Sequence, residues 1–367
     1  MVAAQWIFVS LVIISALAIF PPLRSAMAIM PYVYPNARIK AKEGRLVKSD
    51  RFDEMIAVES VLEIASLLEN TDYMPYLQGI SLEKPGAIEN VLDNYLADLY
   101  DDITKMSPKK VKNLFESLSK KWAGKNIKIV LRNAFSVEGG HEKSPEDIFN
   151  SFSTCDIPED KLKALSECKS VKDLIAELED TRYSLSKYYS IYENTGRLSL
   201  LESAIDKMMY EEILENLPEE PMVKRYFSAL IDASNVKLLL RTKRDGLPLK
   251  EVENFLIEGG EVSDSLKRDF DEMDTKDLIE ELGGTTYHPL KDLLSEYEKT
   301  NSLSPFEREL DRIVAKAGRD ISAPMFGLSP LIGFLSVKEM EAKNLRTIFG
   351  GKVVGMNPED VRSLLIY

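Results

Sequence analysis

The chain has 367 residues, of which 44% are hydrophobic and 29% charged, a balance typical of a globular protein with more than one core. Its formal net charge of −13 argues against a duplex DNA-binding protein, which normally carries a basic face, so we expect no nucleic-acid partner. Its two cysteines and two isolated histidines fit neither a disulfide framework nor a spaced metal motif, so no metal site is expected.

The first predicted element is a hydrophobic N-terminal segment over residues 1–30. Residues 2–23 contain no charged side chain, and about 20 apolar residues in a helix cover about 30 Å, the thickness of a bilayer core. Three interpretations stay open: a transmembrane anchor that leaves the body of the chain in the cytoplasm, a signal peptide cleaved near Ala28, and a translation start at Met27 or Met30. We prefer the late start and place the signal peptide last, because no basic residue precedes the apolar run.

From Pro31 onward the pattern predicts helices. In residues 58–70, for example, apolar residues recur at intervals of three and four with glutamates on the opposite face, as on an amphipathic helix. No extended alternation of apolar and polar residues predicts a strand. Glycine and proline lie between the helical segments, as in residues 83–87 and 244–248, where they indicate turns. We therefore expect an all-α fold of closely packed domains.

Three phrases recur along the chain in the same order, which indicates an internal repeat. The Thr phrase, at residues 67–77, 177–189 and 281–294, pairs a threonine with a tyrosine two positions later: Thr71 and Tyr73, Thr181 and Tyr183, Thr285 and Tyr287. The acidic phrase, at residues 88–96, 201–209 and 306–314, pairs a glutamate with an aspartate four positions later: Glu89 and Asp93, Glu202 and Asp206, Glu307 and Asp311. The Asn phrase is anchored on Asn126, Asn235 and Asn344.

The spacing of these phrases predicts three pseudo-symmetric helical domains. The gaps from threonine to glutamate are 18, 21 and 22 residues, and those from glutamate to asparagine are 37, 33 and 37 residues. Gaps this regular imply a repeat of roughly 105–115 residues. We place the predicted domains at residues 31–140, 141–250 and 251–367.

Each Asn phrase is predicted to form one amphipathic helix. Apolar residues at positions +1, +4 and +5 from the asparagine share one face, and basic residues at +2 and +6 share another. The basic residues are Lys128 and Arg132 in the first phrase, Lys237 and Arg241 in the second, and Arg346 in the third, where Gly350 stands at +6.

Two hypotheses explain the basic faces. In the structural hypothesis, which we favour, each Asn helix packs against the acidic helix of the same domain, so that base opposes acid and the asparagine satisfies a buried polar group. In the functional hypothesis the basic faces bind an anionic partner. A residue that recurs at equivalent positions more often supports the fold than forms three separate sites.

Catalytic motifs are missing from the sequence. It contains no GxxxxGK[ST] phosphate-binding loop, no GxGxxG, no HExxH and no GxSxG. Residues 349–355, FGGKVVG, lack the spacing of a phosphate-binding loop. We therefore expect no catalytic residue, no cofactor and no small-molecule substrate.

Two long stretches resemble a known family. Residues 32–77 contain Tyr32, Tyr34, Asn36, Ala37, Arg38 and Leu46, and residues 325–365 contain Gly327, Pro330, Gly333, Phe334, Glu341, Asn344, Leu345 and Arg346. With the Asn phrases KNIKIVLR and SNVKLLLR between them, these residues resemble the C subunits of archaeal A-type ATP synthases, which are relatives of the d subunit of vacuolar-type proton pumps. The resemblance covers residues 31–367.

The resemblance implies both a fold and a role. The fold is three similar helical domains arranged as a funnel. The role is that of a non-catalytic rotor subunit, peripheral on the cytoplasmic face of the cell membrane, which links the proteolipid ring to the central stalk and couples ATP synthesis or hydrolysis to ion transport. The alternative is a membrane-tethered helical-repeat adaptor unrelated to rotary ATPases, which would also explain the repeats and the apolar N-terminus.

Overall fold

The structure is a computed structural model that describes residues 26–80, 82, 86–141 and 143–366. Every regular element in this part of the chain is a helix, which confirms the all-α prediction. The α-helices are α2 (Val33–Glu43), α3 (Ser49–Ala57), α4 (Val61–Ser66), α5 (Met74–Leu77), α6 (Ala87–Met106), α7 (Lys112–Ser119), α8 (Lys121–Glu138), α9 (Pro145–Phe149), α10 (Glu159–Ser166), α11 (Val171–Leu178), α12 (Ser186–Thr195), α13 (Leu198–Glu215), α14 (Pro221–Arg244), α15 (Leu249–Val252), α16 (Ser263–Arg268), α17 (Thr275–Glu281), α18 (Leu294–Thr300), α19 (Ser304–Ser322), α20 (Ser329–Val353) and α21 (Pro358–Leu364). Short 3-10 turns lie at Met30–Tyr32, Lys109–Val111, Glu253–Phe255, Leu282–Gly284 and His288–Leu293.

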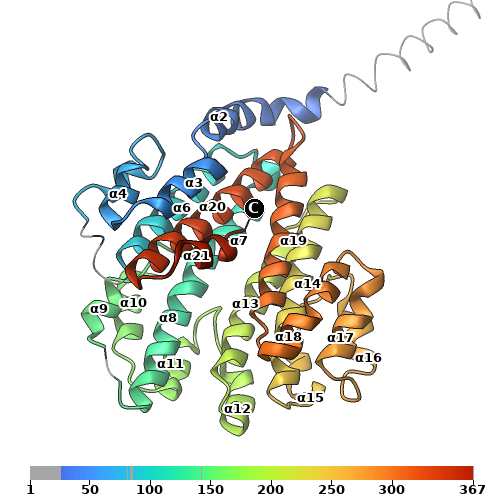
Figure 1. The fold of residues 1–367 in the computed structure, drawn as a ribbon. Coiled ribbons are helices and arrows are strands. Elements are labelled where there is room, and N and C mark those ends of the chain that lie inside the picture. The colour runs from blue at the N-terminus through green and yellow to red at the C-terminus, as the bar shows by residue number, and fades with distance from the viewer. Residues whose placement is uncertain (1–25, 81, 83–85, 142, 367) are drawn as a thin grey trace, which may run out of the picture.

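The longest described helices carry the recurring phrases (Figure 1). The acidic phrases lie on α6, α13 and α19, which we call the acidic helices, and the Asn phrases lie on α8, α14 and α20, which we call the Asn helices. Each has between 18 and 25 residues. On α19 the apolar stripe of Phe306, Leu310 and Ile313 faces the core, so burial of one face stabilises a helix whose other face is charged.

Two glycines allow α19 and α20 to pack closely. A Cβ atom added at Gly333 would lie 2.4 Å from the Cα atom of Ser322, and one added at Gly318 would collide with the Ser336 side chain. Such distances are far inside van der Waals contact, so these two positions require glycine as the structure stands. The consecutive helices therefore approach each other backbone to backbone.

The Thr phrases form the same turn three times. The hydroxyl groups of Thr71, Thr181 and Thr285 each donate to a leucine carbonyl three residues earlier at 2.7 Å. Each hydroxyl also accepts from the backbone N–H of the tyrosine two residues later, at 3.1–3.3 Å. A threonine that bonds to its local backbone competes with continued helix, so it ends one segment and directs the tyrosine ring into the core.

The two ends of the described chain share one core. In Figure 1 the blue helices α2 and α3 lie against the red helices α20 and α21. The Asn36 side chain donates to the Gly327 carbonyl at 3.1 Å, the Val47 backbone N–H donates to Glu341 at 2.6 Å, and Lys352 donates to the Val58 carbonyl at 2.6 Å. The N-terminal helices thus follow α20 along its length.

The predicted hydrophobic segment lies largely outside the described residues, because residues 1–25 are not among them. Within the part of the chain that the structure covers, no helix has the length and apolar character needed to cross a membrane.

Candidate functional site

The three asparagines that anchor the Asn phrases make matching contacts. Each is buried on its Asn helix, and its side-chain amide both donates to and accepts from the backbone of one later residue. Asn126 binds Ser153 at 2.7 and 2.9 Å, Asn235 binds Ile257 at 2.8 and 2.9 Å, and Asn344 binds Ile366 at 2.8 and 2.9 Å. Each asparagine therefore satisfies both backbone groups of a buried residue, the kind of contact that the structural hypothesis expects.

The position three residues before the asparagine carries an acid on two of the Asn helices. On α14, Asp232 accepts from the backbone N–H groups of Glu261 and Val262 and from the Tyr287 hydroxyl, at 3.0–3.1 Å. Burial raises the pKa of Asp232, and these hydrogen bonds to the carboxylate act in the opposite direction. On α8 the same position is Ala123, so that helix lacks the acid.

On α20 the equivalent acid is Glu341, and it has a buried cation beside it. Lys338 is fully buried, donates to Glu341 at 2.7 Å, and places its ammonium 4.9 Å from the centre of the Tyr73 ring. A buried charge needs such a partner because its removal from water is costly. Lys338 was not predicted from the sequence, although its spacing of three residues from Glu341 places the two on one helix face.

The basic residues of the Asn phrases bind the acidic phrases. Lys128 binds Asp206 and Arg132 binds Glu202, the latter at 2.5 Å. Lys237 binds Asp311 at 2.6 Å and Arg241 binds Glu307 at 2.7 Å. Arg346 binds Asp93. We call these five ion pairs the charge belt.

The charge belt corrects the expectation that each Asn helix pairs with the acidic helix of its own predicted domain. The pairs instead join α8 to α13, α14 to α19, and α20 to α6, so each Asn helix binds the acidic helix of the next predicted domain and the last returns to the first. The reason is that α19, for example, packs between α14 and α20 and has neighbours on both sides. Sequence spacing identifies the charged face of a helix but not which neighbour it meets.

Pairing within a predicted domain also occurs, through a residue that was not predicted from the sequence. The lysine directly before the asparagine reaches the acidic helix of its own domain: Lys125 binds Asp93, and Lys343 binds Asp311. Positions −1, +2 and +6 fall on one helical stripe, but they bind different acidic helices. Asp93 and Asp311 are therefore each flanked by cations from two Asn helices. On α14 the equivalent position is Ser234.

Burial perturbs the groups in the charge belt. At Asp93, which is almost fully buried, burial and the neighbouring Arg346 guanidinium lower the pKa of Lys125 to about 7. At Asp311, burial opposes ionisation, but the ammonium groups of Lys237 and Lys343 outweigh it and lower the pKa of the carboxyl group.

The helix pair α20 and α6 lacks the second ion pair that the other two helix pairs of the charge belt have. Arg132 and Arg241 bind the glutamates of α13 and α19, but α20 carries Gly350 at the matching position. The corresponding glutamate on α6 is Glu89, and its Oε2 atom is buried with no hydrogen-bond partner among the described residues. The position at which the third Asn phrase lacks its second basic residue, Gly350, therefore corresponds to a carboxylate oxygen that has no hydrogen-bond partner among the described residues.

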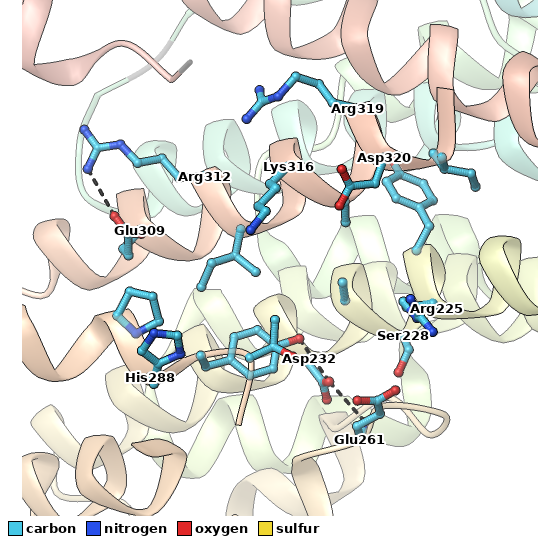
Figure 2. A pocket seen from close by; sticks show the side chains of 18 of the residues that line it. Arg225, Ser228, Asp232, Glu261, His288, Glu309, Arg312, Lys316, Arg319 and Asp320 are labelled. Carbon is cyan, nitrogen blue, oxygen red and sulfur yellow. Dashed lines mark hydrogen bonds and ion pairs between the residues drawn. The ribbon is translucent and has the colours of Figure 1, made fainter. Parts of the chain in front are cut away.

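A pocket of about 650 Å³ lies between α14 and α19 (Figure 2). Figure 2 shows Lys316 extending from α19 toward α14, which contributes Arg225 and Ser228. The pocket has four basic and four acidic lining residues in balance: Arg225, Arg312, Lys316, Arg319, Asp232, Glu261, Glu309 and Asp320. Because the charges balance and Arg312 binds Glu309 at 3.2 Å, the pocket offers no strongly basic or acidic surface to a ligand.

Cys155 and His288 make ordinary hydrogen-bond contacts with their neighbours. The Cys155 thiol accepts from Asn126 at 3.3 Å, and the His288 ring faces the Thr285 carbonyl at 3.3 Å. Within these ranges no cluster of three or more His, Cys, Asp or Glu residues is placed to hold a metal ion. The catalytic, cofactor and metal predictions remain predictions, because they concern the whole chain.

Known proteins match this chain over most of its length. A sequence model of the ATP synthase (C/AC39) subunit family matches residues 35–364. The chain belongs to this family. It is 36% identical to the C subunit of the A-type ATP synthase of Methanocaldococcus jannaschii over 349 residues, which are 92% of this chain and 86% of that protein.

Other relatives carry the same name. The identity is 30% over 353 residues to the C subunit of the A-type ATP synthase of Methanothermobacter thermautotrophicus, covering 93% of this chain and 89% of the relative. It is 29% over 344 residues to that of Pyrococcus horikoshii, covering 91% and 90%. The resemblance drawn from residues 32–77 and 325–365 is therefore confirmed at the level of the family.

The asparagine contacts predict a stability loss that is specific to buried amides. Replacing Asn344→Ala leaves the buried N–H and C=O groups of Ile366 unpaired, so we expect the free energy of unfolding to fall by about 2 kcal/mol or more, as read from denaturant titrations. The exposed Asn254→Ala is the control and is expected to change it by less than about 0.5 kcal/mol. Equal effects of the two changes would contradict a supporting role for Asn344.

Gly350 predicts a stabilising substitution. A Cβ atom at this position meets nothing within 4 Å, so Gly350→Arg can reach toward Glu89 as Arg132 and Arg241 reach their glutamates. We expect Gly350→Ala to raise stability by about 1 kcal/mol through helix propensity, and Gly350→Arg to add about 0.5–1 kcal/mol through the new ion pair. Thermal unfolding measures both.

The comparison is made again in a Glu89→Gln background, where the extra gain from arginine is expected to disappear. If arginine and alanine stabilise equally in both backgrounds, Glu89 is not the partner that position 350 would serve.

Asp311 predicts a pH dependence of stability. Its folded pKa lies below its unfolded pKa, so its contribution is complete above the unfolded pKa of about 3.9 and is lost as the pH falls through the folded pKa. We expect the difference in unfolding free energy between the native chain and Asp311→Asn to shrink as the pH falls from about 5 to about 2.5. The exposed Asp292→Asn serves as the control. A difference that does not change with pH would rule out the ion pairs as its source.

Proposed function

We propose that this chain is a non-catalytic central-rotor subunit of an A-type ATP synthase. In this role it links the central stalk to the membrane proteolipid ring and couples ATP synthesis or hydrolysis to ion transport. Membership of the ATP synthase (C/AC39) subunit family and the shared name of its relatives support the proposal. Its place is on the cytoplasmic face of the cell membrane, as a peripheral subunit.

The observation that carries the mechanical part of the proposal is the cyclic charge belt. A part that transmits torque must resist internal shear, and here every Asn helix is tied by ion pairs to an acidic helix distant in sequence. The helices α14 and α20, of 24 and 25 residues, are each about 36–38 Å long and give the body long stiff members. A twist applied to one of the three linked helix pairs is therefore transmitted to the other two.

The recurrence of these contacts supports the predicted internal repeat. Three matching asparagine contacts, three matching threonine turns and three links between helices are what three related units would give. We infer that the units surround a common axis as a funnel, with one end toward the central stalk and the other toward the ring. The boundaries at residues 31–140, 141–250 and 251–367 belong to this proposal.

Family membership removes the alternative of an adaptor unrelated to rotary ATPases. No enzymatic activity is proposed for the chain itself. The sequence lacks nucleotide-binding motifs, which fits a subunit that transmits work while other subunits handle ATP.

Affinity purification from native membranes tests the proposal. The last described residue, Ile366, is buried, so the tag is inserted instead between Lys143 and Ser144, which are both exposed. From detergent-solubilised membranes we expect the tagged chain to recover proteolipid and central-stalk subunits, and membranes depleted of it to lose ATP-driven ion transport while ATP hydrolysis persists. Untagged membranes are the control. Recovery of neither kind of subunit would contradict the proposed rotor role.

A further inference from the structure

Exposed apolar side chains gather at one end of the molecule. They come from two segments far apart in sequence, the start of the described chain and the loop between α19 and α20. We call this set the apolar cap; it consists of Met27, Met30, Val33, Tyr34, Met325 and Phe326. Met30 is 69% exposed and Met325 is 68% exposed, so these side chains are more accessible than methionines normally are.

The two segments of the cap lie side by side. The Asn36 side chain, on α2, donates to the carbonyl of Gly327, directly after Phe326, at 3.1 Å. Figure 1 shows α2 lying across the end of α19 and α20, where the loop between these helices rises to meet it. The cap is therefore one surface and not two scattered patches.

The helical spacing shows that the exposed residues of the cap do not belong to the helix face that packs into the core. Met27, Met30 and Tyr34 recur at intervals of three and four residues and point outward. On the opposite face, Tyr32, Asn36 and Ile39 are buried against the rest of the molecule. The inner face already has its packing partners. The outer face presents exposed apolar side chains, and the Tyr34 hydroxyl accepts from Arg38 at 3.0 Å.

A basic rim borders the apolar cap. Residues 26–48 contain five basic side chains and one acidic side chain, in a chain whose net charge is −13. Four of the five take part in ion pairs: Arg38 with Asp102 at 3.7 Å, Lys40 with Glu43 at 2.8 Å, and Lys42 and Arg45 with Asp72 at 3.9 and 3.0 Å. The Arg38, Lys40 and Arg45 side chains nevertheless stay between 42% and 65% exposed. The uncharged residues 2–23 precede this region directly in sequence.

We propose that the apolar cap and its basic rim bind the surface of an anionic lipid bilayer. Apolar side chains, among them an amphipathic tyrosine, beside lysine and arginine are the combination that an interfacial helix uses. The apolar side chains enter the boundary between headgroups and acyl chains, and the basic side chains meet the anionic headgroups. The proposal goes beyond the rotor role, since it assigns lipid as the partner of a defined surface.

Methionine oxidation measures the proposed contact residue by residue. The full chain is treated with dilute hydrogen peroxide, with and without vesicles of phosphatidylglycerol and phosphatidylcholine, and each methionine sulfoxide is quantified by mass spectrometry. We expect the vesicles to slow oxidation of Met30 and Met325 at least threefold. Met356, exposed near the opposite end of α20, is the internal control and is expected to react at an unchanged rate.

This design separates the cap from residues 2–23, which can bind vesicles on their own. If the chain sediments with vesicles but Met30 and Met325 oxidise at the rate seen without them, the proposal is wrong. If protection requires proteolipid in the vesicles, the surface binds protein and the lipid assignment is equally wrong, while the rotor role stands.

A pair of variants gives a second test. Met325→Ser with Phe326→Ser is expected to weaken binding to phosphatidylglycerol vesicles about tenfold, with the thermal midpoint unchanged because both side chains are exposed. The matched control is Val354→Ser, an equally exposed apolar residue at the far end of α20. Equal vesicle affinity of the double variant and the native chain would overturn the proposal.

Discussion

Three carboxylates, Asp93, Asp206 and Asp311, hold the long helices of this protein in a closed cycle. Each receives a basic side chain from the Asn helix that precedes it in the cycle, and two of them receive a second cation from their own predicted domain. A charge removed from water is costly unless it keeps its partner, which applies most to Asp93, whose side chain is 2% exposed, and least to Asp206, whose side chain is 41% exposed. The asparagine contacts then fix the segments that follow the Asn helices, and the threonine turns set the entry of the buried tyrosines.

Much of this arrangement could be predicted from the sequence, because recurrence reveals residue types that occupy matching environments. The asparagines, the acid pairs and the basic residues were all found in this way, and Gly350 was identified as the departure beside which Glu89 now lies unsatisfied. The identity of the partner helix was not predictable. A period of 3.6 residues defines a face, but tertiary packing decides which neighbour the face meets. Lys125 and Lys343 were missed because a lysine directly before the asparagine does not recur in all three phrases. The middle Asn helix carries Ser234 at that position.

The two charged surfaces of the molecule differ in kind. The charge belt joins helices to one another with matched bases and acids, and the side chains of Arg132 and Arg241 remain about half exposed. The region around α2 combines partly exposed basic side chains with exposed apolar side chains in an acidic protein. Ion pairs between helices restrain a body, whereas exposed apolar and basic side chains on one surface can bind a partner. The separation of these two properties fits a subunit that must be rigid inside and attached at an end.

Closure of the cycle through α20 and α6 makes the third helix pair unlike the other two during synthesis. The pairs Lys128–Asp206 and Lys237–Asp311 join residues 78 and 74 positions apart, but Arg346–Asp93 joins residues 253 positions apart. The ribosome therefore releases Arg346 last, and until then Asp93 has only Lys125 of its two cationic partners. The pair that closes the cycle therefore forms only after α20 has been made, and a contact of such high sequence separation is a slow step in folding.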